Sequence, residues 1–199
     1  MSTSAARSIS SLGKALAIAI VGVLALGACG SSSSSGSKGA TTSTTPAVSA
    51  RTLLARALQE LTTGQTAQAK SDFEQLVKLD PENKYAYYNL GYIAQTGGNS
   101  GEAETQYGHT LAIDPKFEPA LYNFAILRAN AGATQEAIGL YRKAIAANDK
   151  DANAHFNLGL LLRSSGKTKE GDAEIARAVE LDPSLASAAA AQGVPGINK

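Results

Sequence analysis

A spacing of 34 residues constrains this chain more than any other feature of its sequence. Asp-Pro pairs recur on that spacing at Asp80, Asp114 and Asp182, and Asn148 stands where the remaining pair would begin. Periods of roughly 20 to 50 residues are typical of arrays in which copies of one structural unit stack on each other. Three further series of small residues keep the same register: Gly64, Gly98, Gly132 and Gly166; Ala57, Gly91, Ala125 and Gly159; and Ala69, Ala103, Ala137 and Gly171.

The stretch from residue 84 to residue 117 shows what one copy contains. Its first half carries apolar side chains at the spacing of one helix face. Gly97-Gly98 then permits a tight turn, and Ser100 stands where it can cap a second helix. That helix ends before Pro115, because proline disfavours helical geometry in the residue that precedes it. Each copy is therefore predicted to be a helix, a turn and a helix.

The motif inside each copy resembles the tetratricopeptide repeat. In the second copy Tyr87-x-x-Leu90-Gly91 is followed by Ala103 and Tyr107. Small residues suit the point where the two helices of such a unit cross, since bulky side chains would force the backbones apart. The next two copies carry Leu121-x-x-Phe124-Ala125 with Ala137 and Tyr141, and His155-x-x-Leu158-Gly159 with Gly171 and Ile175.

This resemblance implies an all-α fold, a right-handed solenoid of four helical hairpins. The first copy departs from the pattern, because Arg56 and Glu60 replace apolar or small residues, as terminal repeats often do. An alanine-rich segment after the last copy favours a capping helix. The predicted repeats lie near 50–83, 84–117, 118–151 and 152–185, followed by the cap at 186–199.

The N-terminal segment is predicted to be an export signal. Arg7 and Lys14 precede an uncharged apolar run that is shorter than a typical membrane-spanning helix. This pattern predicts a signal peptide over residues 1–28. The run ends in Leu26-Gly27-Ala28-Cys29, which resembles the lipobox of bacterial lipoproteins, and Cys29 is the only cysteine. The resemblance implies that Cys29 carries a diacylglyceryl anchor. A plain secretory signal with an incidental cysteine is the alternative.

Residues 29–49 are expected to form a flexible tether. They are mostly Ser, Gly, Thr and Ala, a composition that cannot build a core. Such a segment typically spans about 20 to 25 Å, enough to lift the repeats clear of lipid headgroups. Removing Arg7 and Lys14 from the 18 basic residues leaves 16 against 17 acidic ones, a formal charge of −1. This balance gives no indication of nucleic-acid binding.

The sequence predicts neither catalysis nor a bound cofactor or metal. His109 and His155 are the only histidines, and neither has a cysteine or carboxylate at metal-ligand spacing. His155 occupies a packing position of the repeat, where a structural role is expected. The chain has no Gly-x-Ser-x-Gly motif and no glycine-rich phosphate loop. We therefore expect a protein that is not an enzyme.

The candidate binding residues lie on the first helix of each repeat. In tetratricopeptide arrays these helices line the concave surface, so the resemblance implies a trough there. Aromatic rings supply contact area and amides can pair with a peptide backbone. The alternative is that the same side chains only pack neighbouring helices. The predicted trough consists of Leu54, Tyr88, Tyr122 and Phe156 in one row, Leu58, Tyr92, Ile126 and Leu160 in a second row, and Asn89, Asn123 and Asn157 beside them.

Together these features predict a membrane-anchored scaffold that binds an envelope protein or peptide outside the cytoplasm. In a Gram-positive cell, the outer leaflet of the cytoplasmic membrane would hold the anchor. A receptor or carrier for a short peptide or a cell-wall fragment is the alternative, because aromatic rows suit both. Self-association through the ends of the array is a third possibility.

Overall fold

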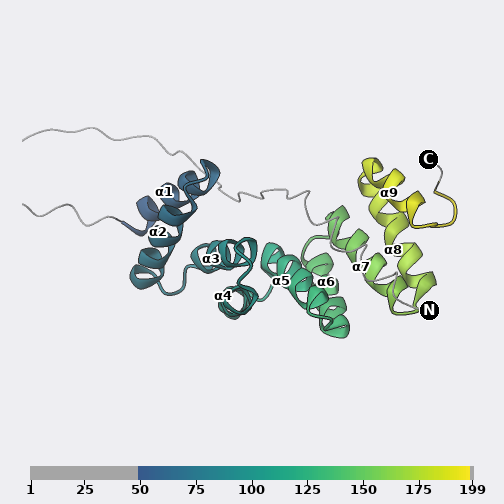
Figure 1. The fold of residues 1–199 in the computed structure, drawn as a ribbon, viewed down its shortest axis with the longest axis horizontal. Coiled ribbons are helices and arrows are strands. Elements are labelled where there is room, and N and C mark those ends of the chain that lie inside the picture. Colours follow the sequence, from purple (N-terminus) through teal and green to yellow (C-terminus); the bar gives the residue numbers. More distant parts are fainter. Residues whose placement is uncertain (1–48, 198–199) are drawn as a thin grey trace, which may run out of the picture. The chain divides into compact units, whose positions relative to one another are not determined.

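The structure, a computed structural model, describes residues 49–197, which hold nine α-helices and no strand (Figure 1). The chain divides into two units, 1–45 and 46–199, and every described residue belongs to the second. The predicted signal peptide at residues 1–28 lies outside the described part, as do Cys29 and nearly all of the tether at 29–49.

Eight of these helices form four consecutive hairpins, whose first helices begin at residues 50, 84, 118 and 152. Each hairpin also contacts the next one, since α2 packs on α3, α4 on α5 and α6 on α7. The predicted all-α repeat solenoid is thereby confirmed. The hairpins are α1 (Ala50–Thr62) with α2 (Thr66–Leu79), α3 (Lys84–Thr96) with α4 (Ser100–Ile113), α5 (Glu118–Asn130) with α6 (Thr134–Ala147), and α7 (Ala152–Ser164) with α8 (Thr168–Leu181).

The turn inside each hairpin explains the uninterrupted glycine series. Gly64, Gly98, Gly132 and Gly166 have φ angles of 78°, 80°, 77° and 82°. Side chains other than hydrogen resist this left-handed region, so glycine is favoured at all four turns. The cap expected at Ser100 was wrong by one residue. Asn99 precedes the helix, and its side chain accepts a hydrogen bond from the Glu102 N–H.

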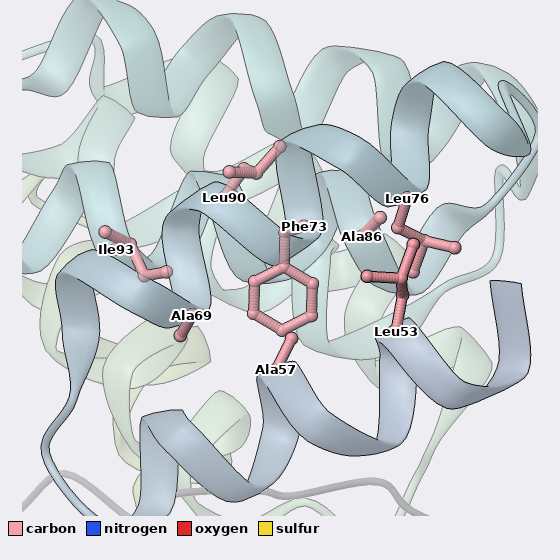
Figure 2. Close-up of a cluster of buried hydrophobic side chains, with 8 residues drawn as sticks. All are labelled: Leu53, Ala57, Ala69, Phe73, Leu76, Ala86, Leu90 and Ile93. Atoms are coloured by element: carbon pink, nitrogen blue, oxygen red, sulfur yellow. The ribbon is translucent and has the colours of Figure 1, made fainter. Parts of the chain in front are cut away.

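Each part of the core joins one hairpin to the next. Figure 2 shows the first cluster, in which α1, α2 and α3 all contribute buried apolar side chains. Phe73 is fully buried in this cluster, and so are Ala57 and Ala69 on the two helices of the first hairpin. A single hairpin could not bury such a surface alone, which is the physical reason for the repetition. The cluster consists of Leu53, Ala57, Ala69, Phe73, Leu76, Ala86, Leu90 and Ile93.

Two glycines allow a close approach of the helices in the fourth hairpin. A Cβ atom added to Gly159 would lie 2.7 Å from the Gly171 carbonyl oxygen, and one added to Gly171 would lie 2.5 Å from that of Gly159. Real Cβ atoms essentially never come this close to another backbone atom. The backbones of α7 and α8 therefore meet where only hydrogen fits on both sides. The equivalent residues of the first hairpin, Ala57 and Ala69, leave room for a methyl group.

The first and the last hairpin of the array each have a feature that the inner hairpins lack. In the first hairpin the Arg56 guanidinium donates through two nitrogens to Asp72, whose side chain is buried. This pair explains why Arg56 stands where other copies have an apolar residue. At the other end η2 (Pro183–Leu185) and α9 (Ala186–Ala191) cover the last hairpin, and Val194 is buried against the same cluster.

Candidate functional site

The structure separates the two rows of the predicted trough by their exposure. In the first row the rings of Tyr88 and Phe156 are only 8% and 3% exposed. Leu54 and Tyr122 in the same row are half-buried. All four members of the second row are half-buried as well, so it offers more surface to a partner. We call this second row the apolar row; its members are Leu58 on α1, Tyr92 on α3, Ile126 on α5 and Leu160 on α7.

The predicted asparagines form hydrogen bonds within the chain. Asn123 Nδ2 donates to the Tyr88 hydroxyl at 3.1 Å, and Asn157 Nδ2 donates to the Tyr122 hydroxyl at 2.9 Å. Both bonds connect one repeat to the next. Asn89 has no such partner, because the equivalent residue of the first repeat is Leu54, and it donates instead to the Tyr85 carbonyl at 2.7 Å.

These bonds show that the asparagines help to set the register between repeats. Sequence analysis left open whether they bind a ligand or only pack neighbouring helices, and it did not identify these hydrogen bonds, although a signal was present. Each tyrosine precedes its asparagine by 35 residues, one more than the period, which places the pair on adjacent first helices. Burial raises the pKa of both Tyr88 and Tyr122 to about 12. The two hydroxyls therefore stay protonated at neutral pH and act as neutral hydrogen-bonding groups.

An acidic pair that sequence analysis missed lies beside these tyrosines. Glu118 is the first residue of α5, and Asp151 caps α7 by accepting from the Asn153 and Ala154 N–H groups at 2.9 and 3.2 Å. Burial, followed by a hydrogen bond to Asp151 and the charge of Asp151, raises the pKa of Glu118 to about 8. At neutral pH the Glu118 carboxyl therefore mostly keeps its proton. We call the two carboxyls the Glu118–Asp151 pair.

The histidines occupy two different environments. His155 is 7% exposed, with Nδ1 2.6 Å from Glu174 Oε2 and Nε2 3.3 Å from the Asp149 carbonyl oxygen. It therefore joins α7 to α8 and to the preceding loop. His109 is exposed, and its ring stacks on that of Tyr87 with the centroids 4.9 Å apart.

The described residues hold neither a metal-binding cluster nor a helix that could cross a membrane. Within residues 49–197 there is no group of three His, Cys, Asp or Glu side chains that could hold a metal ion. No helix in the same range is both long enough and apolar enough to cross a membrane.

Comparison with sequence families gives the same repeat in both halves of the array. Family models described as tetratricopeptide repeats match residues 54–116 and 140–173. No curated protein matches the sequence significantly.

Solved structures resemble the chain more extensively. MamA, PilF and YrrB are each less than 25% identical to the chain, so their similarity shows the fold alone. The protein MamA has a TM-score of 0.60 and 22% identity over 69% of this chain and 75% of its own. PilF of Pseudomonas aeruginosa has a TM-score of 0.62 and 21% identity over 69% and 63%. YrrB, described as a tetratricopeptide repeat protein with an unusual peptide-binding site, has a TM-score of 0.64 and 20% identity over 72% and 74%.

Proposed function

The chain is a tetratricopeptide repeat protein, and we propose that it is a lipid-anchored adaptor which docks a partner protein on the first helices of its repeats. The fold itself supports a protein–protein interaction scaffold, since proteins of this family generally bind other proteins. The observation that carries the proposal is the apolar row. It places a half-buried leucine, isoleucine or tyrosine at the same position of four consecutive repeats.

The apolar row is suited to a partner segment rather than to a small molecule. Helices α1, α3, α5 and α7 each contribute one member, so a contact along the row extends over several repeats. None of the four side chains carries a charge, and charged residues are depleted from the centres of protein interfaces. Leu79 on α2 is the only large apolar side chain of the described residues that is more than half exposed, and it lies outside the half-buried apolar row.

A peptide-like segment also agrees with one structural relative. YrrB is described as having a peptide-binding site, and the present chain resembles it over nearly three quarters of both lengths. Low identity means that the position of that site does not transfer. It supports only the class of partner, a protein segment bound by a repeat array.

The anchoring part of the proposal rests on the sequence. A signal-like segment ends at the only cysteine of the chain, and a Ser- and Gly-rich stretch follows before the first helix. Two acyl chains on Cys29 would hold the protein stably on a membrane. A tethered domain meets an envelope partner at raised effective concentration, so a modest affinity suffices for recruitment. We therefore propose that the protein acts outside the cytoplasm, in the bacterial envelope.

Crosslinking in living cells followed by affinity purification tests the docking face. The native full-length chain is compared with a Tyr92→Ala, Ile126→Ala double variant and with a Leu79→Ala control, which removes an exposed leucine from α2. Circular dichroism first establishes that all three are equally helical. We expect one defined protein to copurify with the native chain and the control but not with the double variant. Equal recovery from all three would rule out the apolar row as the docking site.

A further inference from the structure

Charged side chains on the first helices of the repeats are held against the second helices. Beyond their first turns the first helices carry only three arginines and Glu60. Each arginine donates to a carboxylate on a second helix; the pairs are Arg56 with Asp72, Arg128 with Glu104, and Arg163 with Asp172. Arg163, three residues after Leu160, is the nearest of them in sequence position to the apolar row with a shared helix side, and it also donates to the Gln192 carbonyl at 2.9 Å.

Helix geometry places the other three charged side chains away from the apolar row. Arg56 and Glu60 are each two residues from Leu58. Arg128 is likewise two residues from Ile126. Two residues correspond to about 200° around a helix, so these side chains leave on nearly the opposite side.

The remaining ionisable side chains of these helices, other than tyrosines, lie in the first turns. Arg51, Lys84 and Glu118 come seven or eight residues before the apolar row, about 10–12 Å along the helix axis. Burial raises the pKa of Glu118 to about 8, so this carboxyl mostly stays neutral at pH 7. His155 is closer to the row, and its ring contacts Glu174 on α8. The first helices therefore offer a partner no free charge beside the apolar row.

The polar groups that accompany the apolar row in the predicted trough are neutral. The Tyr88 and Tyr122 hydroxyls keep their protons, since burial raises the pKa of each to about 12. Each hydroxyl already accepts a hydrogen bond, from Asn123 and Asn157 respectively. A charged side chain of a partner would lose water here and meet no opposite charge, which costs free energy. An apolar side chain would instead be stabilised by its burial.

We propose that the partner segment is uncharged where it lies on the apolar row, and that the row selects against basic and acidic side chains equally. This inference rests on the proposed function, because it names the chemistry of the same partner. Both signs of charge are rejected, since the cause is loss of water without a counter-charge and not repulsion. Burial of apolar surface supplies the affinity, so added salt, which screens charges, leaves binding nearly unchanged.

Selection from a displayed library of random peptides supplies the probe for this test. The full chain in mild detergent is used at pH 7.5, and a selected peptide is synthesised with each apolar residue replaced in turn by lysine, glutamate or glutamine. At one or more positions we expect lysine and glutamate to weaken binding to a similar extent, by about ten-fold or more, and glutamine by less. The affinity of the unchanged peptide should vary by less than about two-fold between 50 and 500 mM NaCl.

A carboxylate placed in the apolar row should reverse this selection. Ile126→Glu should bind one lysine-substituted peptide about five-fold more tightly than the native chain does. The control Leu79→Glu, which places the new carboxylate on α2, should not. Circular dichroism first establishes that both variants are folded. If Ile126→Glu is unfolded, the comparison of lysine with glutamate on the native chain decides.

Two other outcomes separate failure of this inference from failure of the proposed function. If the selected peptides share a charged residue at one fixed position, or if only one sign of charge weakens binding, the inference is overturned and the docking face stands. If the native chain enriches no peptide beyond the Tyr92→Ala, Ile126→Ala variant, the docking face itself fails, and the inference fails with it.

Discussion

Replacing Glu118 by glutamine should make the protein more stable at alkaline pH and leave it unchanged at acid pH. The pKa of Glu118 lies at about 8 in the folded chain, against an ordinary value of 4.5. Below pH 4.5 the folded and unfolded states both carry the proton, so the substitution alters little. Between pH 4.5 and 8 the unfolded state has released the proton while the folded state keeps it. Each rise in pH therefore lowers the free energy of unfolding of the native chain.

The size of the effect follows from the same pKa. A carboxyl whose pKa is raised from 4.5 to about 8 on folding would destabilise the folded state by up to about 5 kcal/mol above pH 8 if it were fully shielded from solvent. Glu118 is only half-buried, so solvent screens much of the interaction. We expect a gain of about 1–2 kcal/mol for Glu118→Gln at pH 8.5, because the glutamine amide is never charged and can donate to Asp151 at every pH.

Urea unfolding followed by circular dichroism at pH 4.5, 6.0, 7.0 and 8.5 measures this gain as a difference between variant and native chain. Glu82→Gln is the matched control, since Glu82 is exposed and forms no salt bridge among the described residues. The control should show no pH-dependent difference. A Glu118→Gln variant that is less stable than the native chain at pH 8.5, or a difference that does not vary with pH, would refute the raised pKa of Glu118.

Three further predictions address packing, register and anchoring. Gly159→Ala should lower the free energy of unfolding by about 1–3 kcal/mol, because a methyl group there meets backbone. Gly139→Ala, on a helix with open space around it, should instead raise that free energy by about 0.5–1 kcal/mol in the same urea titration. Tyr122→Phe removes the acceptor for Asn157 and should cost about 1 kcal/mol, measured in the same way. Cys29→Ser should abolish incorporation of a labelled fatty acid and release the protein from the membrane fraction; an unchanged distribution would contradict lipidation.

The fold could be predicted from the sequence because its main determinants are local and repeated. A glycine with positive φ in each turn and a proline after most second helices mark the element boundaries directly. Helix caps were less predictable. Asn99 and Ser100 are both good capping residues, and sequence alone does not show which one has the non-helical backbone.

The binding face could be predicted only in part, because exposure depends on contacts between repeats. The sequence places Tyr88 and Tyr122 at the same position of the repeat, and nothing in either residue shows that one is buried and the other half-exposed. Their difference arises 29 residues further along, where Phe117 follows Tyr88 and Asp151 follows Tyr122. The Glu118–Asp151 pair escaped prediction for the same reason, since it joins two different positions of adjacent repeats.

Departures from the period therefore carry more information about partners than the period does. Positions that repeat faithfully, such as the turn glycines and the small residues at helix crossings, are required by the fold and would be the same for any partner. The position before each first helix varies instead: it is Ser49, Asn83, Phe117 and Asp151 in turn, and all of these except Phe117 cap their helix through a side-chain oxygen. Because this one position governs both the cover over an aromatic ring and the charge beside it, we expect a change there to alter partner choice while the array stays folded. Asp151→Asn, which keeps the cap of α7 and removes the charge, is the smallest such change.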